Sequence, residues 1–435
     1  MAKFLVRRVI FMIITMYAVS VAIFLISEVV PSNIARNTLG NTITPAQEAS
    51  FNAQNGLDQP PLTRYIRWMF GSDWQAARLI GHPVRRLYNA DTSRYSWWVV
   101  GDDGSVYQTF TPDGNTIYYA VRQPDGSTVD VDKGASLWQP NADGLMVFWG
   151  VDPGGRAAMW VQGDDMEEWI RTQASWTNLA GAPRRYIPLQ RGLMRADPGV
   201  SFLTRRPVAE ALVGRLFNTA ILAGTAFLII MPIALALGLI AGLNEGKFID
   251  RLLSVGSLVA TATPEFASGI FLVLIFSSWL DLLPPTVAVT SDTSIFEKPE
   301  MLVLPVMTLT LVELGYVLRI TRASMVEVMR TNYIRTATLK GLPRLRIVLK
   351  HAVRNALMAP ITVIMLHVNW LVGGIVVVES VFGFPGLGSY VLQAALFKDL
   401  FAVEAAAMVL VVIAVGSQMF ADLVYTFLNP RIRYA

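Results

Sequence analysis

The sequence predicts an all-α membrane bundle of six transmembrane helices, with a β-rich domain inserted between the first and second helix. Three features lead to this fold class: long uncharged apolar runs, basic residues clustered between some of them, and one polar stretch with recurring Asp-Gly pairs. The chain has 435 residues, of which 53% are hydrophobic, and several runs reach the roughly 20 apolar residues that cross a bilayer. Cysteine is absent and histidine is scarce, so we expect no disulfide framework and no structural metal site.

The first predicted span is the uncharged run 9–27, which follows Lys3, Arg7 and Arg8. This run is longer than the apolar core of a signal peptide, so it predicts a retained helix that begins in the cytoplasm. The other spans are expected at residues 216–243, 252–280, 301–318, 357–378 and 402–428. Basic residues are concentrated in the turn 244–251 and in the segment 319–354, where nine Lys or Arg accompany one acid. The positive-inside bias therefore predicts that these segments and both chain ends are cytoplasmic.

Residues 72–187 are predicted to form an inserted external domain, because the polar stretch from 31 to 210 contains no span. Asp-Gly pairs recur at 103, 113, 125 and 143, and Asp152-Pro153-Gly154 follows them. Asp-Gly between short β-branched and aromatic runs is a strong hairpin signal. The expected strand runs are 97–100, 106–110, 117–121, 129–131, 145–149 and 159–161. Their spacing predicts a meander in one small sheet or barrel, followed by a helix at 166–179.

Two features of the insert could indicate a binding site, one for sugars and one for calcium. Tryptophans at 97, 98, 138, 149, 160 and 169 could stack on sugar rings, but such residues more often fill the core of a small sheet. We favour the core interpretation. The run Asp130–Gly134 resembles the start of a calcium loop but lacks the later carboxylate ligands, so we expect a hairpin turn there.

The segment from Tyr333 to Thr362 is the part of the chain around which the other features are arranged. Two short helical runs meet at Gly341, where glycine accepts the left-handed conformation that commonly follows a helix end. The second run restarts after Pro343, a residue suited to a first helical turn. A basic helix pair that only fixes the membrane topology is the alternative interpretation, and we disfavour it because topology alone would not require Gly, Pro and Arg-Asn-Ala in this order.

The same segment resembles the cytoplasmic coupling loop of ABC importer permeases in the oligopeptide/dipeptide family. The matching residues are Tyr333, Arg335, Thr336, Ala337, Lys340, Gly341, Leu342, His351, Arg354, Asn355 and Pro360. A second match is an expected external turn, which is similar to the family's Glu-x-x-Phe-x-x-Pro-Gly-Leu-Gly signature. Its matching residues are Glu379, Phe382, Pro385, Gly386 and Gly388. The resemblance covers residues 1–70 and 190–435 and leaves out the insert.

The resemblance implies a type I ABC importer permease, a membrane-spanning transport subunit. In that family the coupling loop docks on an ATPase, so ATP and Mg would be bound by two partner ATPase subunits and no cofactor by this chain. A second homologous permease and an external solute-binding protein are the other implied partners, and no nucleic acid is expected. The implied cargo is a di- or oligopeptide, with an oligosaccharide, an opine or nickel as alternatives. The implied location is a bacterial or archaeal cell membrane (the inner membrane in a Gram-negative cell), with the insert external or periplasmic.

Some residues inside the predicted spans carry further expectations. Glu265 and Glu313 are ionisable, and such groups within spans usually line the bundle interior or a water-filled path; a structural carboxylate is the alternative. Glycines at 224, 238 and 242, with Pro232, allow a kink or close helix packing in the second span. The Gly- and Pro-rich run 379–388 cannot continue a helix, so it predicts an external or re-entrant turn that Glu379 braces.

A membrane-anchored enzyme or sensor that uses the insert is the competing class. It would need a polar catalytic set within 72–187, where His82 is the one histidine and no convincing set occurs. The chain also contains no P-loop and no Gly-x-Ser-x-Gly elbow, so we predict a transport subunit and no catalysis. The predicted divisions are 1–30, 31–71, 72–187, 188–215 and 216–435, the last with the coupling loop 319–357.

Overall fold

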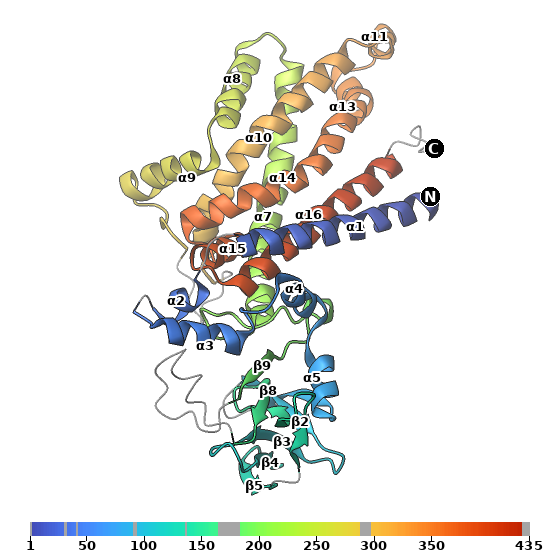
Figure 1. Cartoon of the computed structure of the whole chain (residues 1–435). Helices are drawn as coiled ribbons and strands as arrows, with labels where there is room; N and C mark the ends of the chain where they lie inside the picture. Colours follow the sequence, from blue (N-terminus) through green and yellow to red (C-terminus); the bar gives the residue numbers. More distant parts are fainter. Residues whose placement is uncertain are drawn as a thin grey trace. The chain divides into compact units, whose positions relative to one another are not determined.

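The computed structural model describes residues 2–29, 33–40, 42–89, 94–134, 137–163, 183–287 and 297–428 (Figure 1). The chain forms two compact units. The helical unit comprises Met1–Ala22, Ala211–Leu396 and Ala406–Ala435, and the β-rich unit comprises Ile23–Glu210 and Phe397–Ala405.

Long apolar helices dominate the helical unit. The long helices of the chain are α1 (Ala2–Val29), α7 (Val208–Leu243), α10 (Glu300–Met329), α14 (Met358–Phe382) and α16 (Leu400–Leu428). The shorter ones after α7 are α8 (Phe248–Ala262), α9 (Glu265–Val273), a π-helix (Leu274–Trp279), α11 (Asn332–Leu339), α12 (Arg344–Arg346), a second π-helix (Ile347–Ala352), α13 (Val353–Ala356) and α15 (Leu387–Leu396). Within the described residues, five helices are long and apolar enough to cross a membrane, or up to seven if each of two bent pairs is one span. The predicted number of spans, six, lies between these two numbers.

Two glycines of α7 bring this helix close to α10. A Cβ atom at Gly238 would lie 2.5 Å from the Cβ atom of Thr321, and one at Gly242 would lie 2.7 Å from that of Met325. The two glycines are about one helical turn apart, so they present a small-residue face against which the neighbouring helix packs. Close helix packing is thus confirmed at these positions, whereas Gly224 has no such neighbour among the described residues.

The third predicted span is wrong as a continuous helix. α8 ends at Ala262, α9 begins at Glu265, and the two helices are bent by 107° relative to each other. The cause is Pro264, which has no N–H to donate and disfavours a helical conformation at the preceding residue. Thr263 accordingly has a ψ of 125°. Glu265 is therefore the first residue of α9 and does not lie in the middle of a straight span.

The turn after the fifth span begins later than predicted. α14 continues through Glu379 to Phe382 and ends at Gly383, which has a φ of +63°. Residues between Glu379 and Phe382 include no Gly or Pro, so nothing ends the helix before Gly383. A bend of 76° then separates the end of α14 from α15. The expected break in the helix is present, and it lies at residues 383–386.

The β-rich unit contains two antiparallel sheets, so the prediction of one sheet or barrel is wrong. The first sheet has the strand order β1-β2-β3-β4-β5 and the second has the order β6-β7-β8-β9. The strands are β1 (Val84–Asn89), β2 (Arg94–Val100), β3 (Val106–Phe110), β4 (Tyr118–Arg122), β5 (Thr128–Asp132), β6 (Gln139–Pro140), β7 (Met146–Val151), β8 (Arg156–Val161) and β9 (Arg185–Pro188). Each of the six predicted runs corresponds to a strand, whereas β1, β6 and β9 have no predicted counterpart.

Two sheets form because their apolar faces cover each other. One buried cluster includes Trp97, Val99 and Tyr107 from the first sheet and Val151 and Trp160 from the second. A single extended sheet would leave both faces in water, so the burial of apolar area favours stacking. Figure 1 shows the strands gathered beside α5 (Asp73–Ile80).

The tryptophans of the insert serve mainly as core residues. Trp97, Trp98, Trp138 and Trp160 are each at most 8% exposed, which confirms the core interpretation for these four. Trp149 is half-buried. Trp169 and the predicted helix 166–179 lie outside the described residues.

The Asp-Gly pairs form tight turns, as predicted. Gly104, Gly114, Gly126 and Gly144 have φ values between +73° and +91°, a region that glycine occupies without strain. The carboxylates of Asp103, Asp113 and Asp125 accept backbone N–H groups two residues further on, at 2.9–3.0 Å. Hydrogen bonds to these carboxylates hold the pKa values of the three aspartates below their usual range.

The two ends of the inserted segment are tied together at Ser72 and Gln190. The backbone N–H of Ser72 donates to the carbonyl of Gln190 at 2.9 Å, and the N–H of Gln190 donates to the hydroxyl of Ser72 at 3.0 Å. Ser72 is fully buried. The chain therefore leaves the preceding helices and returns to them at one point, as is common for an inserted domain. Those helices are α2 (Ile34–Leu39), α3 (Pro45–Asn55) and α4 (Pro61–Phe70).

A fragment of residues 72–190 should fold on its own, because it contains both sheets and their shared core up to Leu189. We expect a mainly β circular dichroism spectrum and cooperative thermal unfolding. Trp160→Ala should lower the free energy of unfolding by about 3–5 kcal/mol, because it removes a large buried side chain. Trp74→Ala is the control and should cost little, since Trp74 is 57% exposed. A disordered spectrum of the unmodified fragment would show that the insert is not an independent domain.

Candidate functional site

A helix cap at Gly341 shapes the predicted coupling segment. Gly341 has a φ of +73°. Its N–H donates to the carbonyl of Thr338 at 3.0 Å, and the N–H of Leu342 donates to the carbonyl of Ala337 at 3.3 Å. This pair of bonds is a Schellman motif, which ends α11 and requires the left-handed conformation at Gly341. The predicted left-handed cap and the helical restart after Pro343 are both confirmed.

The short helices of the segment share a core with the end of α10. Ile334 and Ala337 of α11 are buried in one cluster with Ile347, Val348 and Met325. Partly buried residues of α7 and α10, together with Leu342, pack against the same cluster. Because such cores are close-packed, a displacement of α11 is transmitted to the helices that share its core.

Three of the predicted coupling residues are in contact. The side-chain amide of Asn355 donates to the hydroxyl of Tyr333 at 2.9 Å and to the carbonyl of His351 at 3.1 Å. This contact connects the start of α11 to the helix that leads into α14. Of the other predicted residues, the exposed ones are Arg335, Thr336, Lys340 and Arg354, the buried ones are Ala337 and Pro360, and Leu342 is half-buried.

The coupling segment also exposes apolar side chains that have no counterpart among its predicted coupling residues. Leu339, Leu345 and Leu349 are 81%, 70% and 63% exposed. They lie among exposed basic residues, including Lys340 and Arg344. Large apolar side chains grouped at a charged surface are typical of a protein interaction site.

Glu379 joins α14 to α7 and to the start of α15. Its carboxylate accepts from the hydroxyl of Thr219 at 2.6 Å and from the N–H of Ser389 at 3.0 Å. The hydroxyl of Thr219 in turn accepts from the N–H of Leu387 at 2.7 Å. Glu379 has no exposed surface, so its side chain and that of Thr219 satisfy N–H groups that α15 would otherwise leave without partners.

The other signature residues surround this carboxylate. A Cβ atom at Gly386 would lie 1.9 Å from Oε1 of Glu379, and one at Gly388 would lie 2.6 Å from the Cα atom of Val376. Only glycine therefore fits at either position. Phe382 is 1% exposed and accepts a hydrogen bond from the N–H of Val287 at 2.8 Å through its carbonyl. These contacts agree with the prediction that Glu379 braces the turn.

Glu265 and Glu313 occupy different helices. Glu265 is the first residue of α9 and is half-buried. Glu313 lies within α10 and is 2% exposed, which is the burial expected of an ionisable residue that faces the interior of a bundle.

An ion pair between α8 and α10 was not predicted. Nη2 of Arg322 lies 2.8 Å from one carboxylate oxygen of Asp250, and its Nε contacts the other. Asp250 also accepts from the N–H of Gly246 at 2.8 Å and is 2% exposed. The available sequence signal is weak, because Asp250 and Arg322 are far apart along the chain.

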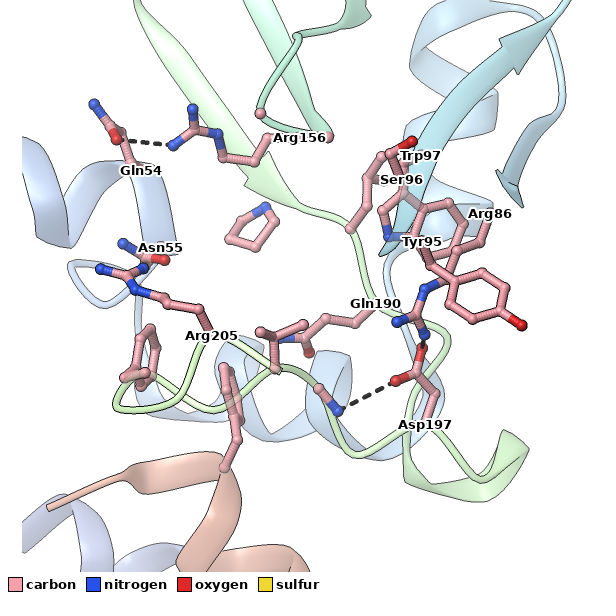
Figure 2. A pocket seen from close by; sticks show the side chains of 18 of the residues that line it. Gln54, Asn55, Arg86, Tyr95, Ser96, Trp97, Arg156, Gln190, Asp197 and Arg205 are labelled. Atoms are coloured by element: carbon pink, nitrogen blue, oxygen red, sulfur yellow. Dashed lines mark hydrogen bonds and ion pairs between the residues drawn. The ribbon is translucent and has the colours of Figure 1, made fainter. Parts of the chain in front are cut away.

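A cavity in the β-rich unit was also not predicted. It has a volume of about 680 Å³ and is lined by three arginines, Arg86, Arg156 and Arg205, together with Asp197 (Figure 2). These residues come from separate strands and loops, so their proximity has no signature in the sequence.

Comparison with known proteins identifies the class. Residues 234–434 match the family described as binding-protein-dependent transport system inner membrane component, and residues 1–78 match the corresponding N-terminal family. The chain therefore belongs to the family of binding-protein-dependent transport system inner membrane components. It is a multi-pass membrane transport subunit and not an enzyme.

Individual relatives agree with this assignment. A putative peptide transport system permease of Brucella abortus (strain 2308) is 36% identical over 56% of this chain and 77% of its own length. The oligopeptide transport system permease of Bacillus subtilis (strain 168) is 31% identical over 58% and 80%, and the dipeptide transport system permease of Escherichia coli (strain K12) is 30% identical over 58% and 81%. The resemblance to this permease family is thereby confirmed.

Among solved structures, an inward-facing MetNI methionine ABC transporter aligns with a TM-score of 0.42 and 15% identity. The alignment covers 51% of this chain and 97% of that chain.

Gly341→Val should weaken transport by the assembled complex. A β-branched residue resists a positive φ, so we expect α11 to shift against the helices that follow it and ATP-driven uptake to fall by about tenfold or more. Binding of the external partner should be unchanged. The measurement is uptake and ATP hydrolysis, side by side, by the complex reconstituted in vesicles.

Gly341→Asn is the matched control, because asparagine tolerates the left-handed conformation better than other side chains. Apart from Gly341 and its two neighbours in the chain, no described atom lies within 4 Å of a Cβ built at Gly341. A steric clash would therefore not contribute to a difference between the Val and Asn variants. Normal uptake by the Val variant, with cargo-stimulated hydrolysis, would show that this cap does not transmit the ATPase motion.

Proposed function

We propose that the chain is one of two membrane-spanning subunits of an ATP-driven importer of short peptides. The observation that carries the proposal is the coupling segment, where exposed leucines and basic residues stand on both sides of the helix cap at Gly341 in the sequence. This surface suits a soluble partner that contributes apolar and acidic side chains. The named functions of the relatives, which include dipeptide and oligopeptide transport, support a peptide cargo.

The coupling segment would dock on an ATPase subunit that binds ATP and Mg. Closure of two such ATPases on ATP would push on α11, and the core shared with Met325 would carry the movement into α10. For ATP to drive transport, the outward- and inward-open states must differ in their contacts with both ATP and cargo. The chain itself would make and break no bond.

The cargo path would lie between this chain and a second, related permease. Glu265 and Glu313 are the candidate path residues, because ionisable groups in apolar helices are costly unless they face protein or water. An external solute-binding protein would deliver the cargo, and the insert would face the same side of the membrane. Both chain ends and the coupling segment would be cytoplasmic, as their positive charge favours.

An oligosaccharide cargo has less support than a peptide. The tryptophans that would favour sugar stacking are largely buried in the core of the β-rich unit, so they are not available as a stacking surface. Opines and nickel have no supporting observation among the described residues.

Uptake by the reconstituted complex tests the cargo assignment. Vesicles that contain this chain, its second permease and both ATPases, with the binding protein on the opposite side from ATP, should accumulate labelled trialanine. They should accumulate little maltotriose, and a non-hydrolysable ATP analogue should abolish uptake. ATP-dependent uptake of maltotriose without uptake of trialanine would overturn the peptide assignment.

Cysteine labelling tests the topology. The chain has no cysteine, so Thr128→Cys and Arg344→Cys each introduce a single thiol at an exposed position. In intact cells a membrane-impermeant maleimide should label Thr128→Cys, and it should label Arg344→Cys only after permeabilisation. The reverse pattern would contradict the proposed orientation.

A further inference from the structure

Among the described residues, one of the three arginines that line the cavity of the β-rich unit has no carboxylate partner. Nη1 of Arg86 lies 3.0 Å from Asp197, and Nη2 of Arg156 lies 2.8 Å from Asp152. Arg205, in contrast, has no carboxylate within ion-pair distance among the described residues. Its guanidinium carbon lies 6.0 Å from the centre of the Phe51 ring, and the side chain is exposed. Two of the three arginines are thus compensated, and Arg205 is left for a ligand.

The backbone at Arg205 is held in a conformation that this residue type disfavours. Its φ is +58°, in the left-handed region that costs a non-glycine residue free energy. The loop is closed by two hydrogen bonds, from Ser201 N–H to Arg206 carbonyl and from Arg205 N–H to Ser201 carbonyl, each 3.0 Å long. Strain of this kind persists where the surroundings impose it and is concentrated at functional sites.

Asp399 fixes this loop from a distant part of the chain. Its carboxylate accepts from the N–H of Phe202 at 3.1 Å and from the hydroxyl of Ser201. Asp399 is 3% exposed, so these are buried, charge-assisted hydrogen bonds, which are among the stronger ones in proteins. The backbone at Arg205 is therefore held in place before any ligand arrives, which lowers the entropic cost of ordering this loop on binding.

A second hollow, with one apolar wall, adjoins the arginine-lined cavity. It has a volume of about 450 Å³, and Leu39, Ile43 and Phe51 contribute its apolar wall. Four residues line both spaces: Gln54, Asn55, Arg156 and Arg205. Figure 2 shows the amide side chains of Gln54 and Asn55 and the guanidinium groups of Arg156 and Arg205 at the cavity. A ligand that fits both spaces carries an anionic group beside an apolar side chain.

We infer that the β-rich unit binds the C-terminal carboxylate of a short peptide with an apolar last residue. The guanidinium of Arg205 pairs with the carboxylate in the two-bond geometry that arginine favours. The side-chain oxygen of Asn55 can accept an N–H of the peptide backbone, since the amide nitrogen of Asn55 already donates to the carbonyl of Phe51 at 2.8 Å. Gln54 accepts from Nη1 of Arg156 at 2.8 Å and so holds that side chain at the cavity. The apolar side chain of the peptide enters the hollow beside Phe51. The site would hold peptides on the chain itself, in addition to the binding protein. The inference that this site binds the same peptides that are transported rests on the proposed function.

Binding to the full chain in lipid nanodiscs tests the site, with Ala-Ala-Phe as the probe and isothermal titration calorimetry as the measurement. We expect Ala-Ala-Phe to bind, and both its C-terminal amide and Gly-Gly-Gly to bind at least about tenfold more weakly, because each lacks one of the two recognised groups. Equal affinity for the acid and the amide would overturn the inference. Binding of inorganic phosphate as tight as that of Ala-Ala-Phe would also overturn it, since the hollow would then contribute nothing.

Arg205→Gly separates loss of charge from loss of folding. Glycine accepts the left-handed backbone without strain, so the thermal stability should be unchanged or higher while the affinity for Ala-Ala-Phe falls about tenfold or more. Arg206→Gln is the matched control, because Arg206 is exposed and does not line the cavity; its affinity should change less than about twofold. Unaltered binding in Arg205→Gly would disprove the role of Arg205.

Uptake by the vesicle-reconstituted complex distinguishes this inference from the proposed function. If trialanine is transported but the full chain binds no Ala-Ala-Phe, the inference fails alone. If Ala-Ala-Phe binds in the Arg205-dependent way and no peptide is transported, the site stands and the proposed cargo fails.

Discussion

Backbone groups freed by a break in an apolar helix must find partners within the protein, since lipid offers none. The helical unit meets this constraint with side chains from neighbouring helices. Where α14 ends and α15 begins, Glu379 and Thr219 accept the N–H groups of Ser389 and Leu387. The glycines of the signature follow from the same arrangement, because a buried carboxylate can reach the turn only if no Cβ atom stands at Gly386. At Gly341, in the segment that we propose to be cytoplasmic, the Schellman motif caps α11 with backbone hydrogen bonds alone.

Features that depend on local sequence are predictable in this chain. Asp-Gly pairs specify tight turns because glycine is needed at a positive φ, and the alternation of these turns with β-branched and aromatic runs locates six of the strands. Gly341 and Pro343 mark a helix end and a restart for equally local reasons. The apolar runs identify the long helices, although α10 and α14 extend past the charged or polar residues at which hydropathy suggests that a span ends.

Features that depend on contacts between distant residues are not predictable in the same way. Whether the strands form one sheet or two stacked sheets depends on which apolar faces can cover each other. The positions of Trp97 and Trp160 in the sequence do not show which side chains they will contact in the core. The ion pair of Asp250 with Arg322 and the grouping of Arg86, Arg156 and Arg205 likewise require the fold. The bend at Pro264, in contrast, follows from a local signal that a continuous span does not take into account, since proline and the residue before it both disfavour a continuous helix.

The cavity of the β-rich unit arises from the way in which the insert is attached. The hydrogen bonds between Ser72 and Gln190 bring the entry and exit of the inserted segment to one point, so the neighbouring helices need not separate to accommodate it. Arg86 and Arg156 come from strands that lie between the two family matches, whereas Gln54 and Phe401 come from segments within those matches. Neither group of residues lines the whole cavity without the other. Arg205 also lies between the two family matches, so the cavity combines residues inside those matches with three arginines outside them.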